Sequence, residues 1–279
     1  MNGLILLNKE ANMTSHDLVN KVRKQLVTKK VGHTGTLDPN ATGLMIIAFG
    51  KATKLVNYLQ KDSKEYVLEM QLGVLTDTLD IWGKLLKEEE FTKPSRKDFN
   101  SILEGFVGKQ QQQPPMYSAI KIKGRKLYEL ARENIIVDIP KREIEIYEVE
   151  LLEYNNTIKI RVICSSGTYI RTLCLDIAKK CGTIGTMTSL VRTKVGDFNL
   201  VDANTIAQLQ NNDFQVIKPE VALSNYHVVE YTNLSDVLNG RTITLDTNED
   251  LVLIKVNGDI MAFYERVNNN TFKSKRGLW

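Results

Sequence analysis

The sequence predicts an α+β domain over residues 1 to about 222, followed by a small all-β module over roughly the last 55 residues. Two observations predict this division. Segments with helical spacing of apolar residues alternate with strand-like segments through the first part, whereas short strand-like runs and tight turns follow from about Tyr226. In that last part, Asn239-Gly240 and Asn257-Gly258 each stand between strand-like runs, a strong signal for β-hairpins.

The first elements are a strand, a capped helix and a second strand. Leu4 to Leu7 form a short apolar strand, and Thr14 with Asp17 predicts a helix capped at its start. After a glycine-rich loop, a strand is expected over 44–49 and a helix over about 51–60.

The middle of the domain continues the alternation. In residues 65–73 the apolar side chains alternate, which places Tyr66, Leu68, Met70 and Leu72 on one face of a strand. An acidic run at 88–90 indicates a solvated connection before a helix near 96–104. A strand at 159–164 and a turn at 165–168 precede a helix whose apolar stripe contains Ile170, Cys174, Ile177 and Cys181.

Composition and charge narrow the class of protein. With 279 residues, 42% hydrophobic and 25% charged, the chain is ordinary globular protein, and its net charge of +4 alone decides nothing about partners. The charge is unevenly distributed, however. Residues 109–132 hold six basic residues against one acidic, and residues 156–196 hold seven against one, giving local charges of +5 and +6. Such segments either coat a solvated face or contact a polyanion.

The cellular location follows from several absences in the sequence. No apolar run approaches the roughly 18 residues of a membrane span, and the N-terminal segment lacks the pattern of a signal peptide. The three cysteines have neither disulfide nor zinc spacing and are expected to be buried small hydrophobic residues. A cytoplasmic protein without metal or cofactor is therefore expected.

The loop from Gly32 to Gly43 is the most unusual stretch, because three glycines, three threonines, His33 and Asp38-Pro39 fall within twelve positions and support no helix or strand period. Pro39 favours extended backbone at Asp38 and so stiffens the support of its carboxylate. The alternative is an Asx turn in which Asp38 bonds only local amides. The loop lacks the phosphate-binding glycine patterns, and His33 lacks partners at zinc-ligand spacing.

Other candidate residues are ambiguous when taken singly. Arg171, beside an apolar helical stripe, either holds a carboxylate in a cleft or covers the edge of the core. Tyr66 is also compatible with a core tyrosine, and Lys9 with a solvated lysine after the first strand. Taken separately, these signals leave two classes open, a cytosolic enzyme or an RNA-binding protein.

The combination of motifs resembles one family. The loop at 32–43 closely resembles the catalytic motif of the bacterial tRNA pseudouridine synthase B family, which isomerises uridine 55 in the T loop of tRNA. Further matching motifs follow in the same order from residue 3 to about 198: Lys9 with Thr14-Ser15-His16-Asp17; Tyr66 with Leu72-Gly73-x-x-Thr76-Asp77-Thr78-x-Asp80; Gln113-Pro114-Pro115-x-Tyr117-Ser118-Ala119-x-Lys121; Ser166-Gly167-Thr168-Tyr169-Ile170-Arg171; and Leu190-Val191-Arg192-Thr193.

The resemblance implies a fold and a set of roles. It implies a pseudouridine synthase fold, with a central mixed, mainly antiparallel sheet flanked by helices over 1–222 and a small PUA-like RNA-binding module over 223–279. It implies Asp38 as nucleophile, Tyr66 stacking on the target base and Arg171 pairing with Asp38. The implied substrate-contacting residues are Lys9, His33, Tyr169 and Leu190, and the implied partner is the T arm of tRNA, bound by a monomer without a protein partner.

One departure from the family pattern is visible after the first strand, where the family has Lys-Pro-x-Gly and this chain has Lys9 followed by Glu10-Ala11-Asn12. Asn12 can adopt the left-handed conformation of a glycine, so the turn is expected to survive. Two rival functions remain: a non-catalytic RNA-binding protein or tRNA-folding chaperone, and a nucleotide-dependent enzyme that uses the glycine loop for phosphates.

Overall fold

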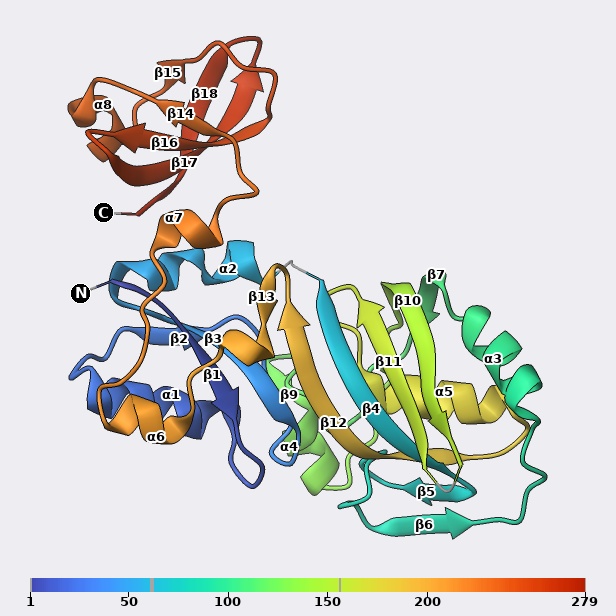
Figure 1. Cartoon of the computed structure of the whole chain (residues 1–279). Helices are drawn as coiled ribbons and strands as arrows, with labels where there is room; N and C mark the ends of the chain where they lie inside the picture. The colour runs from blue at the N-terminus through green and yellow to red at the C-terminus, as the bar shows by residue number, and fades with distance from the viewer. Residues whose placement is uncertain (1, 61–62, 156, 279) are drawn as a thin grey trace. The chain divides into compact units, whose positions relative to one another are not determined.

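The computed structural model describes residues 2–60, 63–155 and 157–278 (Figure 1). The chain divides into two compact units. The first comprises Met1–Pro39, Met45–Gln60 and Asp202–Trp279, and the second comprises Asn40–Leu44 and Lys61–Val201. Across the described ranges, no helix combines the length and the hydropathy that crossing a membrane requires.

The N-terminal part of the first unit follows the predicted order. Strand β1 (Gly3–Lys9) is almost wholly buried, and helix α1 (Ser15–Gln25) begins after Thr14, whose side chain forms the predicted capping box with Asp17. Strand β2 (Val31–His33) pairs antiparallel with β3 (Thr42–Phe49). The predicted helix over 51–60 forms in two parts, a 3-10 helix η1 (Gly50–Leu55) and a short α2 (Val56–Leu59).

The C-terminal part of the first unit holds a separate five-stranded sheet. Its strands, in spatial order, are β14 (Val228–Glu230), β16 (Leu251–Val256), β17 (Asp259–Asn268), β18 (Thr271–Gly277) and β15 (Ile243–Thr244). The short helices before and beside it are α6 (Ile206–Gln210), α7 (Pro219–Ala222) and α8 (Leu234–Leu238). The predicted β-rich module is thus present, and its boundary near residue 222 stays a prediction.

The two Asn-Gly pairs have different structures. Asn257 and Gly258 have φ of 53° and 88° and connect β16 to β17, so this predicted hairpin is confirmed. The prediction for Asn239-Gly240 is wrong, because Asn239 is the C-cap of α8. The side chain of Asn233 accepts hydrogen bonds at the start of that helix, and an Asn-Gly pair suits a helix end as well as a hairpin.

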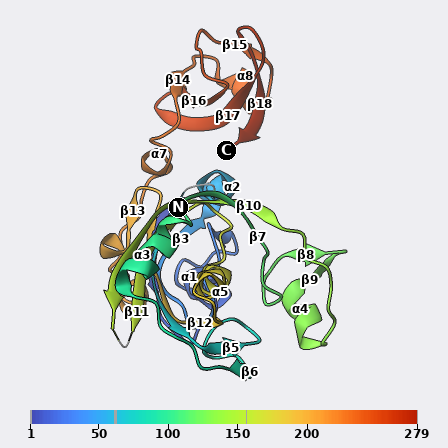
Figure 2. The same ribbon diagram turned by 90° about the vertical axis from the view of Figure 1, so that its right-hand side faces the viewer.

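The second unit is built on a mixed, mainly antiparallel sheet, as predicted. Its strands lie in the order β12 (Gly185–Val195), β4 (Lys64–Leu72), β11 (Ile158–Cys164), β10 (Arg142–Tyr154) and β7 (Gly108–Gln112), all antiparallel to their neighbours. Only the start of β3, at Thr42 and Gly43, runs parallel to β12 among these described pairs. Helix α5 (Ile170–Lys180) packs on β12 and β4, and α3 (Arg96–Glu104) packs on β10 (Figure 2).

Smaller elements surround this sheet. They are β5 (Val74–Thr76), β6 (Leu85–Glu88), β8 (Lys121–Ile122), β9 (Arg125–Lys126), α4 (Leu127–Arg132) and the 3-10 helix η2 (Leu200–Asp202). The short β13 (Phe198–Asn199) belongs to the sheet itself and pairs antiparallel with β12. The basic segment 109–132 therefore carries secondary structure, and Leu127 and Leu130 of its helix form a small apolar cluster with Ile139, which follows the helix in the chain.

The apolar residues of the second unit lie where the sequence predicts. Tyr66, Leu68, Met70 and Leu72 are all buried on β4. Cys164 and Cys174 are buried as expected, whereas Cys181 is only half-buried. Burial raises the pKa of the Cys164 and Cys181 thiols to about 11, so both are protonated at neutral pH.

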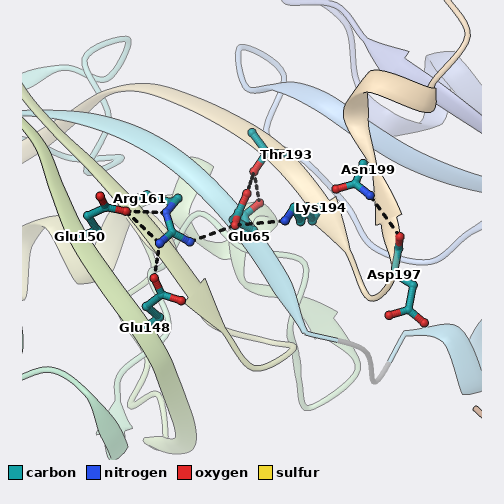
Figure 3. Close-up of polar contacts among 8 residues, drawn as sticks. All are labelled: Glu65, Glu148, Glu150, Arg161, Thr193, Lys194, Asp197 and Asn199. Carbon is teal, nitrogen blue, oxygen red and sulfur yellow. Dashed lines mark hydrogen bonds and ion pairs between the residues drawn. The ribbon is translucent and has the colours of Figure 1, made fainter.

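A network of charged side chains ties four strands together (Figure 3). The buried carboxylate of Glu65 on β4 accepts hydrogen bonds from Arg161 at 3.1 Å and from the Thr193 hydroxyl at 2.7 Å, and Lys194 lies 3.9 Å away. Arg161 also meets Glu148 and Glu150 of β10, and these carboxylates raise its pKa further above the ordinary value. Because successive strand residues face opposite sides, Glu65 holds β4, β10, β11 and β12 in register behind Tyr66.

We expect the buried member of this network to matter most. Glu65→Gln should lower the free energy of unfolding by about 1–3 kcal/mol, because it weakens the buried end of the ion-pair network. Glu150→Gln is the matched control: its carboxylate is half exposed, so the loss should stay below about 1 kcal/mol. Urea denaturation of both variants measures the difference, and equal losses would contradict the assignment.

Candidate active site

Lys9 at the end of β1 is fully buried, which corrects the expectation of a solvated lysine. Its Nζ donates to the carbonyl oxygens of Glu10 at 2.9 Å, Met13 at 2.7 Å and Pro39 at 2.8 Å. Three acceptors match the three N–H donors of an ammonium group. The turn that they close contains Asn12 at φ 60°, the predicted left-handed conformation.

The glycine-rich loop is shorter than the sequence suggested, because β2 and β3 include its two ends. Within it, the Ser15 hydroxyl accepts a hydrogen bond from the Leu37 amide at 2.9 Å and donates to the Leu37 carbonyl at 3.0 Å. The Gly35 amide donates to Nδ1 of His33 at 3.2 Å. The loop is therefore anchored at Leu37 by the first residue of α1.

Asp38 lies between two fixed residues. Leu37 on one side is bonded to Ser15, and the carbonyl of Pro39 on the other accepts from Lys9 and from the Met13 amide at 3.4 Å. The side chain of Asp38 itself is half-buried. The sequence predicted a stiff support from Pro39 alone, and the structure adds contacts from β1 and from the start of α1.

Arg171 in the first turn of α5 is 5% exposed and is not a surface-covering arginine. Its two terminal nitrogens donate to the carbonyls of Thr78 and Tyr117, each at 2.8 Å. Its Nε lies 4.0 Å from the carboxylate of Asp80. The guanidinium is thus oriented by two backbone segments that are far from it in the sequence.

Asp80 is the residue to which sequence reasoning gave no role. It stands on the turn between β5 and β6, where the Thr78 hydroxyl donates to its carboxylate at 2.8 Å. Asp77, on the same turn, accepts a hydrogen bond from the Tyr117 hydroxyl at 3.3 Å. The pKa of Tyr117 is raised mainly by burial and, second, by the charge of Asp77. The Thr-Asp-Thr-x-Asp spacing is typical of side-chain-bonded turns and was the available signal.

Tyr66 lies in a row that crosses three strands. Gly43 of β3 pairs with Arg192 of β12, and Arg192 pairs with Tyr66 of β4. Gly43 has φ 108°, and a Cβ there would lie 2.3 Å from the Arg192 carbonyl, so this close approach requires glycine. Arg192 is 1% exposed and donates from Nε to the Leu44 carbonyl at 2.7 Å.

Leu190 lies on β12 beside this row, and Tyr169 directly precedes α5. Leu190 pairs with Leu68 of β4, so it shares a sheet face with Tyr66 and Arg192. Tyr169 is the residue before α5, and its amide and carbonyl both bond the side chain of Gln112, at 2.8 and 3.1 Å. Tyr66, Arg171, Tyr169 and Leu190 thus belong to the second unit, while Lys9, His33 and Asp38 belong to the first.

Comparison with known proteins agrees with these motifs. Residues 23–170 match the model for TruB family pseudouridylate synthase (N terminal domain), and residues 171–224 match that for tRNA pseudouridylate synthase B C-terminal domain. A Mesoplasma florum protein named tRNA pseudouridine synthase B is 40% identical over 99% of this chain and 97% of its own length. The chain belongs to the TruB family of pseudouridylate synthases. A Bacillus pumilus member with the same name is 48% identical over 76% of this chain and 71% of its own.

Solved structures support the fold of this TruB family member. The archaeal box H/ACA sRNP Nop10-Cbf5 complex contains a chain with a TM-score of 0.73 and 22% identity, covering 99% of this chain and 86% of that one. A chain of an H/ACA RNP bound to a substrate RNA containing 2′-deoxyuridine gives 0.72 and 21%, covering 99% and 85%. The pseudouridine synthase fold predicted from the sequence is therefore confirmed.

We expect Lys9 to be a major stabilising residue of the first unit. Lys9→Met should lower the free energy of unfolding by about 2–4 kcal/mol, because it leaves the carbonyl oxygens of a partly buried turn without their charged donor. Lys24→Met, at an exposed lysine of α1, is the control and should change it by less than about 0.5 kcal/mol. Chemical denaturation compares the two variants. An unchanged free energy of unfolding in Lys9→Met would refute the role of these hydrogen bonds.

Proposed function

We propose that this protein isomerises uridine 55 in the T loop of tRNA to pseudouridine, with Asp38 as the nucleophile. The observation that carries the proposal is the position of Asp38 within the family's catalytic motif, with the backbone held on both sides by Ser15 and Lys9. A nucleophile supported in this way loses little conformational freedom when the substrate binds. The relatives' names, tRNA pseudouridine synthase B, support tRNA as the substrate.

The reaction requires the target base to leave its stack. A flipped uracil lies against the Tyr66 ring, which repays part of the lost stacking, about 1–3 kcal/mol per base. The carboxylate of Asp38 forms a covalent bond to the substrate, and the bond from C1′ to N1 breaks. After the uracil turns, C1′ bonds C5, and the bond to Asp38 breaks again and frees the carboxylate. The proton on C5 leaves to a base, for which Tyr66 is the candidate, and N1 gains a proton, so the product is an isomer of uridine.

Arg171 has the chemistry to keep Asp38 ionised. Desolvation by a bound base favours the neutral carboxylic acid, whereas a guanidinium close by favours the carboxylate. A guanidinium has five N–H donors, and the hydrogen bonds to the carbonyls of Thr78 and Tyr117 use its outer nitrogens and fix its plane. A fixed plane suits a two-pronged contact with a carboxylate.

The covalent path of the chain supports bringing Asp38 and Tyr66 together. Gly43 is the fifth residue after Asp38, and it belongs to the row that contains Arg192 and Tyr66. Five residues span at most about 18 Å when extended. The loop that carries the nucleophile therefore ends next to the strands that carry the stacking residue.

The remaining assignments concern the RNA and the setting. His33, Tyr169 and Leu190 are proposed to contact the T arm, and the basic segments at 109–132 and 156–196 to contact its phosphates. For Lys9 the three carbonyl contacts favour positioning of the loop over contact with a phosphate. We further propose a cytoplasmic monomer with a catalytic domain over 1–222 and an RNA-binding module over 223–279.

The decisive experiment uses an unmodified tRNA transcript followed by mapping of pseudouridine by position. The protein should form pseudouridine at position 55, and Asp38→Asn should abolish product while RNA binding changes less than about threefold. A protein that binds or refolds tRNA but forms no pseudouridine would establish the chaperone alternative. Saturable binding of ATP or GTP would instead favour the nucleotide-dependent alternative.

A second substitution tests the role of Arg171. Arg171→Lys keeps the charge and loses the planar fork, so kcat should fall by a factor of about 100 or more while the KM for tRNA changes little. Single-turnover kinetics on the same transcript measure the chemical step. A rate near that of the wild type would show that a two-pronged contact is not needed.

A further inference from the structure

Trp82 is an exposed aromatic residue whose role the proposed reaction leaves open. It stands on the turn between β5 and β6, and its residue is 52% exposed. Contiguous exposed apolar surface is one signal of a binding site, and exposed apolar residues adjoin Trp82 in the sequence. Tryptophan is also the side chain with the largest flat face on which a nucleobase can stack.

Several hydrogen bonds hold the turn that carries Trp82. The amide of Trp82 donates to the carboxylate of Asp80 at 3.2 Å, and the amides of Ile81 and Met187 bond the turn to β12 at 2.9 and 3.1 Å. Gly83 allows this close packing, since a Cβ there would lie 2.2 Å from the Thr78 hydroxyl. A side chain on such a support needs little ordering when it binds.

The same turn also provides two groups that face the Arg171 guanidinium. Asp80, which accepts from the Trp82 amide, lies 4.0 Å from Nε of Arg171, and the Thr78 carbonyl accepts from the guanidinium at 2.8 Å. Trp82 is thus two residues from the group that faces Arg171. A base resting on Trp82 would therefore be bound by the same turn that holds the guanidinium proposed to pair with Asp38.

We propose that Trp82 is a stacking platform for an unpaired base of the RNA substrate, next to the base that is isomerised. This rests on the proposed function and adds a binding residue to it. Half-exposed Ile81, Leu85 and Leu86 adjoin Trp82 in the sequence, so an apolar surface for a protein partner is the competing explanation. The hydrogen bonds between the Trp82 turn and Arg171 favour RNA as the occupant, because the substrate has to approach that guanidinium in the proposed reaction.

The first experiment reads Trp82 directly. The chain has two tryptophans, at 82 and 279, so the emission lost in Trp82→Phe belongs to Trp82. Titration with an unmodified T-arm stem-loop RNA should quench this component with saturation, and Trp82→Phe should lack this component of the quenching. Absence of quenching in the wild type at RNA concentrations that saturate binding would overturn the proposal.

Kinetics with the tRNA transcript separate stacking from a general apolar contact. Trp82→Ala should raise the KM by about fivefold or more with kcat within about twofold, and Trp82→Phe should recover part of the loss because it keeps a ring. Leu86→Ala is the control, and its KM should match the wild type. An unchanged KM in Trp82→Ala, or an equal rise in Leu86→Ala, would overturn stacking.

Failure of this inference is distinguishable from failure of the proposed function. If the wild type forms pseudouridine at position 55 while the Trp82 variants bind and react normally, only the stacking platform is wrong. If the wild type forms no pseudouridine, the enzymatic function fails, and quenching by the stem-loop still tests whether Trp82 meets RNA.

Discussion

A cation taken out of water has to satisfy each of its N–H groups inside the protein, and this requirement organises both units. Lys9, Arg171 and Arg192 are all at most 5% exposed, and each donates to backbone carbonyl oxygens. A charged donor strengthens such a bond to about 1.5–3 kcal/mol, so each cation fixes the backbone around it. Lys9 fixes the loop with Asp38, Arg171 fixes two peripheral segments, and Arg192 fixes the start of β3 at Leu44.

Elements whose signal is local could be predicted from the sequence. The capping box of α1 and the alternation in β4 each lie within a dozen residues, and both formed as expected. The stripe of α5 formed at Ile170, Cys174 and Ile177, whereas Cys181 is the half-buried C-cap of that helix. The catalytic-motif residues were identified by the resemblance and not by geometry. The two Asn-Gly pairs show the limit of local signals. The same dipeptide ends helix α8 at 239–240 and forms a hairpin turn at 257–258.

The contacts that define the site could not be predicted, for a physical reason. Arg171 bonds the carbonyl of Thr78, 93 residues away, and that of Tyr117, 54 residues away. Every residue has a carbonyl, so such a bond leaves no trace in residue type. Lys9 illustrates the same point, since nothing in its own sequence neighbourhood distinguishes a buried ammonium from a solvated one.

The two faces of β4 depend on each other through strand geometry. A slip of one residue would exchange Glu65 and Tyr66 between faces, placing a carboxylate where the base is proposed to stack. On one face, the contacts of Glu65 with Arg161 and Thr193 oppose that slip. The close packing of Gly43 in β3 against the backbone of Arg192 opposes it as well, because it fixes β12 beside β4. The position of Tyr66 therefore depends on contacts made by residues outside the proposed reaction, and the plane of Arg171 depends on carbonyls outside the sheet.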